Sequence, residues 1–202
     1  MYDVVPLAPL YHDGHDDVRQ LRDVVHTEFN IEGYPSHDFV SLVCEVRPKQ
    51  VTLVPDPPDV LTSNAGWTVT AHSDMLKDVL TRFTEAGIRT SLFIETDQVQ
   101  IEAAAKVGAD RIELYTESFA TQYAKLGAEA AAPFAEAAQW AHDAGLGVNA
   151  GHDLNLANLR DLAEAVPQLD EVSIGHALIS DALYLGMSNA VAQYRACLAP
   201  RG

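Results

Sequence analysis

GLGVNAGHDLNLANLRDLAEAVPQLDEVSIGHA, residues 145–177, contains a strand, a helix and a second strand in succession. Residues 145–151 are apolar and rich in glycine, as in a buried strand, and residues 155–166 have the apolar spacing of a helix that Pro167 ends. Residues 170–177 form the second strand. Two strands joined by a helix pair in parallel with a right-handed crossover, so this stretch predicts a parallel α/β sheet.

The same alternation extends over the rest of the chain. We expect five further strands, at residues 3–8, 27–33, 50–55, 89–95 and 110–116. The expected helices span residues 15–26, 36–47, 74–87, 97–109, 118–125, 128–144 and 178–199. An irregular segment at 56–74 follows the third strand, and structureless loops of more than about 12–15 residues are often functional.

Alternating strands and helices leave two architectures, an open doubly wound sheet and a (β/α)8 TIM barrel. The first strand is not followed by a G-x-G-x-x-G or Walker loop, which disfavours a nucleotide-binding open sheet. The strands also contain the polar residues Asn30, Glu32, Glu113 and Asn149, which a barrel can turn toward its interior or mouth. We therefore expect residues 1–202 to form a single α/β barrel domain, with seven strands instead of eight.

Composition narrows the classes of function. The 202 residues include 29 acidic and 13 basic ones, and the net charge of −16 argues against a nucleic-acid partner. No apolar run approaches the roughly 20 residues that span a bilayer, and no signal peptide is recognisable, so we expect a cytoplasmic protein without a membrane partner. Cys44 and Cys197 are expected to be reduced thiols, and neither they nor the histidines have the spacing of a metal site.

The carboxyl ends of the strands carry candidate chemistry, because active sites of barrels lie there. Glu32 and His152 could act as general base and acid. The pair Gly175 and His176, before a helix, could bind phosphate through backbone N–H groups. Each has a structural alternative: Glu32 and Glu113 could be members of buried ion pairs, and His152 a hydrogen-bonded rim residue. The pattern alone therefore indicates a phospho-sugar reaction at a barrel mouth and leaves the roles open.

Six ordered segments resemble the pyridoxine 5′-phosphate synthase family, and they cover the chain from about His12 to the end. They are TEFNIEGYP, VTLVPDPPDVLTSNAGW, GIRTSLFIETD, AAKVGADRIELYT, GLGVNAGHDLN and VSIGHALISDAL. The resemblance implies a (β/α)8 barrel that assembles as a homo-octamer. It implies a transferase-class ring closure in which 1-deoxy-D-xylulose 5-phosphate and 3-amino-2-oxopropyl phosphate give pyridoxine 5′-phosphate, phosphate and water. No cofactor and no metal are implied.

Site residues follow from the same resemblance. It implies that Glu32 and His152 are catalytic, with His152 as the proton donor. The substrate-binding residues that it implies are His12, Thr62, Asp153, Gly175 and His176.

The chain departs from the family pattern near its amino-terminal end. Family members have a strand with an N-x-D-H motif and then a helix with a substrate-binding arginine, and neither occurs here. The family's general-base histidine corresponds to Val5 and a following arginine to Leu7, and neither side chain can transfer a proton or bind phosphate by charge. We therefore expect a barrel without its first strand and helix, with little or no synthase activity. Two alternatives remain: a non-catalytic phosphate-binding or assembly subunit, and a different phospho-sugar barrel enzyme.

Overall fold

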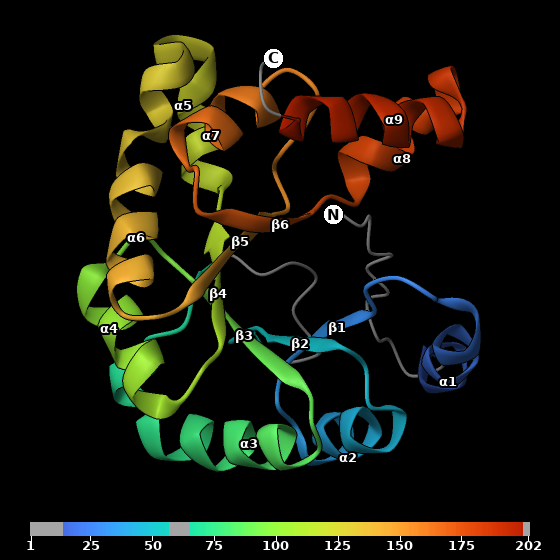
Figure 1. Cartoon of the computed structure of the whole chain (residues 1–202), viewed down its shortest axis with the longest axis vertical. Helices are drawn as coiled ribbons and strands as arrows, with labels where there is room; N and C mark the ends of the chain where they lie inside the picture. The colour runs from blue at the N-terminus through green and yellow to red at the C-terminus, as the bar shows by residue number, and fades with distance from the viewer. Residues whose placement is uncertain (1–13, 57–64, 200–202) are drawn as a thin grey trace.

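The computed structural model describes residues 14–56 and 65–199, in which six parallel strands form one sheet. Each strand hydrogen-bonds to the next one in the chain. The strands are β1 (Asn30–Gly33), β2 (Gln50–Leu53), β3 (Arg89–Ile94), β4 (Arg111–Tyr115), β5 (Gly147–Gly151) and β6 (Leu169–Ser173). The sheet curls around a central axis (Figure 1). This arrangement confirms the α/β barrel class, while the strand expected at residues 3–8 lies outside the described residues.

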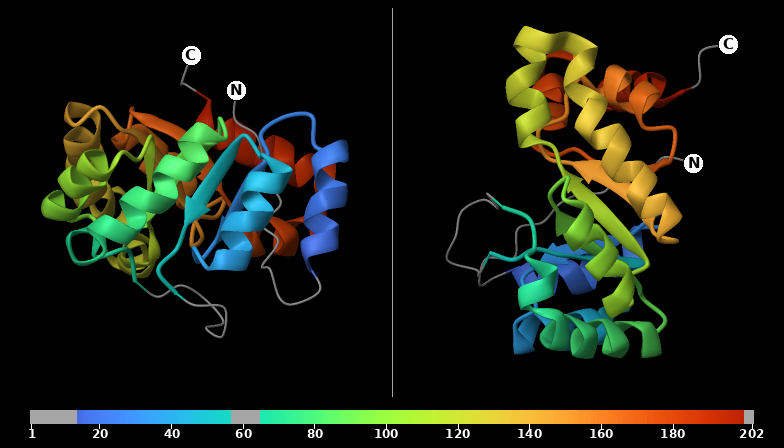
Figure 2. Two further views of the ribbon diagram at one scale, coloured as in Figure 1. Left: turned by 90° about the horizontal axis from the view of Figure 1, so that it is seen from below. Right: turned by 90° about the vertical axis from the view of Figure 1, so that its left-hand side faces the viewer.

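Helices connect the strands and cover the outside of the curled sheet (Figure 2). They are α1 (Gly14–Val24), α2 (His37–Val46), α3 (Ser73–Glu85), α4 (Gln98–Val107), α5 (Glu117–Leu126), α6 (Ala132–Asp143), α7 (Leu159–Ala165), α8 (His176–Leu185) and α9 (Met187–Leu198), with 3-10 helices at Val69–Ala71 and Gly127–Ala131. Within the described part of the chain, no helix combines the length and the apolar composition needed to cross a membrane.

Local capping explains several helix ends. The Ser36 hydroxyl accepts a hydrogen bond from the Phe39 N–H (3.2 Å) at the start of α2, and the Asp97 carboxylate accepts one from the Gln100 N–H (3.1 Å) at the start of α4. Such caps each stabilise a helix by about 1 kcal/mol. At the other end of α4, Gly108 has a left-handed backbone with φ of 90°, which glycine adopts without steric cost.

Three expected helices differ from the observed ones. The helix expected at 128–144 is the 3-10 helix Gly127–Ala131 followed by α6. The closing helix expected at 178–199 is two helices, α8 and α9, because Gly186 interrupts it with φ of 79° and ψ of 144°. The helix expected at 155–166 begins only at Leu159. The side chains of Asn155 and Asn158 hold a turn before it, where they accept the backbone N–H groups of Ala157 (2.9 Å) and Asn155 (2.8 Å).

The sheet is apolar toward the helices and polar toward the barrel axis. Its buried apolar side chains, such as Leu92, Ile112 and Val148, join the helices in one core cluster. The alternate positions carry buried polar side chains: Asn30, Thr52, Ser91, Glu113 and Asn149. Because successive strand residues point to opposite faces, the same alternation builds the core and lines the barrel with polar groups.

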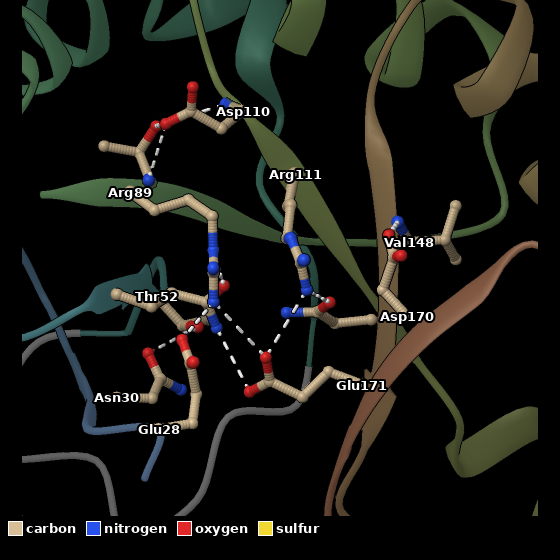
Figure 3. Close-up of polar contacts among 12 residues, drawn as sticks. Glu28, Asn30, Thr52, Arg89, Asp110, Arg111, Val148, Asp170 and Glu171 are labelled. Carbon is tan, nitrogen blue, oxygen red and sulfur yellow. Dashed lines mark hydrogen bonds and ion pairs between the residues drawn. The ribbon is translucent and has the colours of Figure 1, made fainter. Parts of the chain in front are cut away.

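A charged network lies at the amino-terminal ends of the strands, away from the expected site (Figure 3). Arg89 pairs with Glu28 and approaches Glu171 at 3.5 Å. Arg111 donates to Asn149 (2.9 Å) and contacts Glu171 at 3.4 Å. Glu171 is buried, so these two guanidinium groups supply the positive charge that makes its carboxylate tolerable there.

Candidate active site

Three titratable side chains from distant parts of the chain meet at one end of the barrel. Glu32 lies in β1, Glu113 in β4, and His152 directly follows β5. The His152 Nε2 atom lies 3.2 Å from Glu32 Oε1. One ligand-type atom from each of the three residues falls within 4.8 Å of the other two. The structure thus brings together Glu32 and His152, as the sequence predicted, and adds Glu113.

His152 projects from a strained turn. Its backbone has φ of 70°, the left-handed region that side chains other than glycine rarely adopt. The His152 N–H donates to the carbonyl of Ser173 at the end of β6 (2.9 Å). Gly151 before it must be glycine, because an added Cβ would lie 2.7 Å from both Glu113 Oε1 and the Ser173 carbonyl oxygen. The turn therefore aims the imidazole across the barrel toward β1.

Glu113 is the deepest of the three groups. It is fully buried, and neither carboxyl oxygen has a hydrogen-bond partner among the described residues. Burial, assisted by the charge of Glu32, raises the pKa of Glu113 to about 8. Glu113 is therefore protonated at neutral pH, and it forms no salt bridge with any residue that the structure describes, so the described part of the chain gives no support to its interpretation as an ion-pair member.

His152 carries a positive charge at neutral pH. Burial opposes that charge, but the hydrogen bond to Glu32 and the negative charge of Glu32 outweigh burial. Glu113 adds its own negative charge once it ionises above about pH 8, and together these groups raise the pKa of His152 to about 9. The pair is thus an imidazolium beside a carboxylate, which is the protonation state of a proton donor. The three side chains are ligand types for a metal ion and lie close enough together to meet one. With protons on both Glu113 and His152, however, the trio does not suit a metal ion at neutral pH, because metal ligands must be deprotonated.

Aromatic rings form one wall of the site. The Phe93 ring lies with its centroid 5.0 Å from that of His152 and 5.0 Å from that of Tyr115. Phe93 is fully buried, so it keeps water from one side of the imidazole. Burial raises the pKa of Tyr115. The negative charges of carboxylates at the rim, of which Asp153 has the largest effect, raise it further.

The remaining predicted site residues occupy different positions. Asp153 is exposed at the rim, and its backbone N–H donates to the Gly151 carbonyl (3.1 Å). Gly175 is the N-cap of α8 and His176 its first residue, and no side chain caps this helix start. Ser173, which holds His152, precedes them by two residues, so the start of α8 adjoins the site. The predicted positions that lie outside the described residues are Val5, Leu7, His12 and Thr62.

Sequence reasoning did not identify Glu113 as a site residue. It shares a face of its strand with Arg111 and Tyr115, and an acidic side chain flanked by Ile112 and Leu114 was the available signal. That signal shows burial but not which partners meet the carboxyl group. The proximity to Glu32 and His152 depends on the curvature of the sheet, which a one-dimensional pattern does not contain.

Comparisons with known proteins agree on one family. A family model described as "Pyridoxal phosphate biosynthesis protein PdxJ" matches residues 11–200. Pyridoxine 5′-phosphate synthases from Parabacteroides distasonis and Bacteroides fragilis are each 57% identical over 187 residues, which is 93% of this chain and 79% of theirs. The enzyme of that name from Christiangramia forsetii is 54% identical over 183 residues, covering 91% of this chain and 77% of its own.

Solved structures add a comparison of fold. The tryptophan synthase A-subunit from Pyrococcus furiosus matches with a TM-score of 0.59 and 12% identity, covering 93% of this chain and 72% of that one. A likeness at this identity concerns the barrel architecture alone.

Proposed function

The chain belongs to the pyridoxal phosphate biosynthesis protein PdxJ family, and from that membership we propose that it is a pyridoxine 5′-phosphate synthase. Its substrates are 1-deoxy-D-xylulose 5-phosphate and 3-amino-2-oxopropyl phosphate, and its products are pyridoxine 5′-phosphate, inorganic phosphate and water. The observation that carries the proposal is the imidazolium–carboxylate pair of His152 and Glu32 at 3.2 Å, next to the protonated Glu113.

The protonation states suit the chemistry of this condensation. Ring closure with loss of water needs a proton for each departing hydroxyl group and a base for the proton released at the neighbouring carbon. His152 gives its Nε2 proton to the hydroxyl group, which leaves as water, and Glu32 takes up the proton from the carbon. Glu113 lies behind them with its own proton and can donate a hydrogen bond to negative charge that develops on the substrate.

Substrate binding is assigned to the barrel mouth. The start of α8 at Gly175 and His176 offers backbone N–H groups that no side chain caps, which is the usual setting for a phosphate group. Asp153 adjoins the proton donor and is exposed at the rim. By resemblance, His12 and Thr62 complete the substrate-binding set.

The low expected turnover has a definite cause. Val5 occupies the general-base position of the family and Leu7 an arginine position, so one proton acceptor and one phosphate contact are absent. Loss of a general base lowers the rate by about 10²–10⁴-fold. This observation also favours the second candidate function, a subunit that binds phosphate and assembles without turnover.

An assay with both substrates separates the two functions. Pyridoxine 5′-phosphate and inorganic phosphate are measured for the 202-residue chain, for His152→Gln and for Lys77→Gln, an exposed change on α3 away from the site. Slow product formation that Lys77→Gln keeps and His152→Gln abolishes supports the synthase. Binding of 1-deoxy-D-xylulose 5-phosphate without any product supports the assembly subunit, and product formation by His152→Gln contradicts the proposed mechanism.

Self-association is the partner interaction that the surface favours. Large apolar side chains are exposed along α8 and the start of α9, with Leu183 81%, Tyr184 91% and Met187 51% exposed. Contiguous apolar surface of this kind marks interaction sites. We propose that a second copy of the chain covers it on the way to a homo-octamer in the cytoplasm. No nucleic-acid or membrane partner is proposed.

Light scattering after gel filtration tests this interface. Leu183→Gln is expected to lower the molecular mass of the main species, while the matched variant Val24→Gln, on α1, leaves it unchanged; Val24 is also exposed, at 65%. An unchanged mass for Leu183→Gln contradicts the proposed interface.

A further inference from the structure

The strained backbone at His152 requires something to hold it. Non-glycine residues in the left-handed region occur twice in the described structure, at Arg47 and His152. Arg47 is the C-cap of α2, where that conformation is common. His152 has no such helix end to explain it, and a strained residue persists only where its surroundings determine its conformation.

The peptide group between Gly151 and His152 is held at both of its ends. Its N–H donates to the Ser173 carbonyl at 2.9 Å. Its oxygen, the carbonyl of Gly151, accepts a hydrogen bond from the Thr116 hydroxyl and a second one, from within the turn itself, from the Asp153 N–H (3.1 Å). Because the bonds to Thr116 and Ser173 come from opposite sides, from the end of β4 and the end of β6, the peptide plane cannot rotate without breaking one of them.

The Thr116 hydroxyl bonds to the Gly151 carbonyl and not to a backbone N–H group of the helix that Thr116 begins. Thr116 is the N-cap residue of α5, and threonine at that position normally caps its own helix through the hydroxyl. Here the side chain makes no capping bond, and the residue is completely buried. The hydroxyl is therefore committed to the turn that carries His152 and not to the helix that it begins.

We propose that Thr116 is a positioning residue for His152: its hydroxyl fixes the Gly151 carbonyl and so keeps the imidazole in contact with Glu32. This proposal rests on the proposed function, because it concerns the proton donor of that reaction. The Phe93 ring supports the imidazole from the side, at 5.0 Å between centroids, but it makes no polar bond that could fix the peptide plane. Without the hydroxyl, the turn can relax toward an unstrained φ, and the Nε2 atom then moves away from β1.

Three titratable groups surround the imidazole, and they are the same in every variant. They are Glu32 from β1, Glu113 from β4, which holds a proton at neutral pH, and Asp153 in the turn itself. A change at Thr116 alters none of them, so any effect on His152 must come from its placement. Loss of the contact with Glu32 leaves burial as the main influence, which lowers the pKa of a histidine.

The test measures His152 directly by NMR titration of its ring in four forms of the full chain. Thr116→Val removes the hydroxyl and keeps the shape, and Thr116→Ser keeps the hydroxyl. Thr90→Val is the matched control: Thr90 is also completely buried, and its hydroxyl bonds to Asp110 (2.9 Å) at the opposite end of the barrel. The expected result is a pKa of about 9 in the wild type, Thr116→Ser and Thr90→Val, and a clearly lower pKa in Thr116→Val.

Product formation is followed in parallel. Misplacement of a catalytic group by about 1 Å costs about 10²-fold in rate, so Thr116→Val should lose turnover with its KM unchanged, and Thr116→Ser should recover most of it. A wild-type pKa in Thr116→Val overturns the positioning role whatever the activity. If the titrations follow the expected pattern but the wild type forms no product, the proposed function fails and the positioning role stands.

Two further comparisons distinguish a general loss of stability from a loss of positioning of His152. Thr90→Val reports the stability lost with any buried threonine hydroxyl. Should Thr116→Val not fold, Thr116→Cys, which keeps the shape but is a weak donor, replaces it, and a wild-type His152 pKa in that variant overturns the proposal.

Discussion

The protonation state of Glu113 determines the net charge of the candidate site. Its carboxyl group is buried without a hydrogen-bond partner in the described structure, so its charged form is disfavoured until the pH reaches about 8. A neutral Glu113 adds no negative charge to the pair formed by Glu32 and the imidazolium. The buried, protonated Glu113 is therefore compatible with Glu32 as the base and His152 as the acid. Enzymes whose acid and base differ only in their environment use the same principle.

Glu113 also makes the stability of the fold depend on pH. Its pKa is about 8 in the folded protein against 4.5 for an ordinary glutamate, so between these values the folded state binds a proton that the unfolded chain has lost. Stability from this residue is complete below pH 4.5 and is lost as the pH rises to about 8. Glu113→Gln removes the proton and keeps the shape, so its free energy of unfolding should fall less over this range.

Urea denaturation at pH 5 and pH 8 measures the difference. The wild type should lose up to about 1.4 kcal/mol per pH unit more than Glu113→Gln over the steep part of this range. Parallel pH dependences of the two proteins would show that Glu113 is ionised in the folded state.

At the scale of elements, the alternation of strand and helix patterns predicted most of the described fold. The six described strands follow from local apolar patterning, which is readable along the chain. The sequence indicated Glu32 and His152 as candidates because each lies at the carboxyl end of an expected strand. The break at Gly186 was missed because a glycine in an apolar helical pattern is compatible with a continuous helix.

The break between α8 and α9 has a testable conformational cause. Gly186 has φ of 79° and ψ of 144°, a region open almost only to glycine. Gly186→Ala should therefore destabilise the protein by about 1–3 kcal/mol, although alanine is the better helix former. Thermal unfolding measures this. A raised melting temperature would mean that residues 178–199 form the continuous helix that the sequence favours.

At the scale of the whole molecule, the two ends of the barrel carry different arrangements of ionisable side chains. The carboxyl end holds the site, with charges balanced by protons on Glu113 and His152. The amino end holds fixed charges, where Arg89 and Arg111 face Glu171. Long-range pairing of this kind depends on the curvature of the sheet, so the sequence predicted the presence of the residues and not their partners.

The amino-end network should matter for stability and not for chemistry. Arg111→Met leaves the buried Glu171 with one cationic partner fewer, and removing a partner from a buried ion pair costs about 3–5 kcal/mol, less here because Arg89 remains. The matched variant Arg19→Met breaks the exposed bond to Glu45 and should leave stability nearly unchanged. Equal effects of the two variants in urea denaturation would contradict a structural role for the network.

The most direct test of the proposed catalytic pair, Glu32 and His152, is the titration of the His152 ring by NMR in the wild type and in Glu32→Gln. Because His152 is an imidazolium held by Glu32, its pKa should be about 9 in the wild type and should fall clearly in Glu32→Gln, which keeps the shape but removes the negative charge. A wild-type value near the ordinary 6.5, or the same value in both proteins, would contradict the assignment of His152 as a proton donor paired with Glu32.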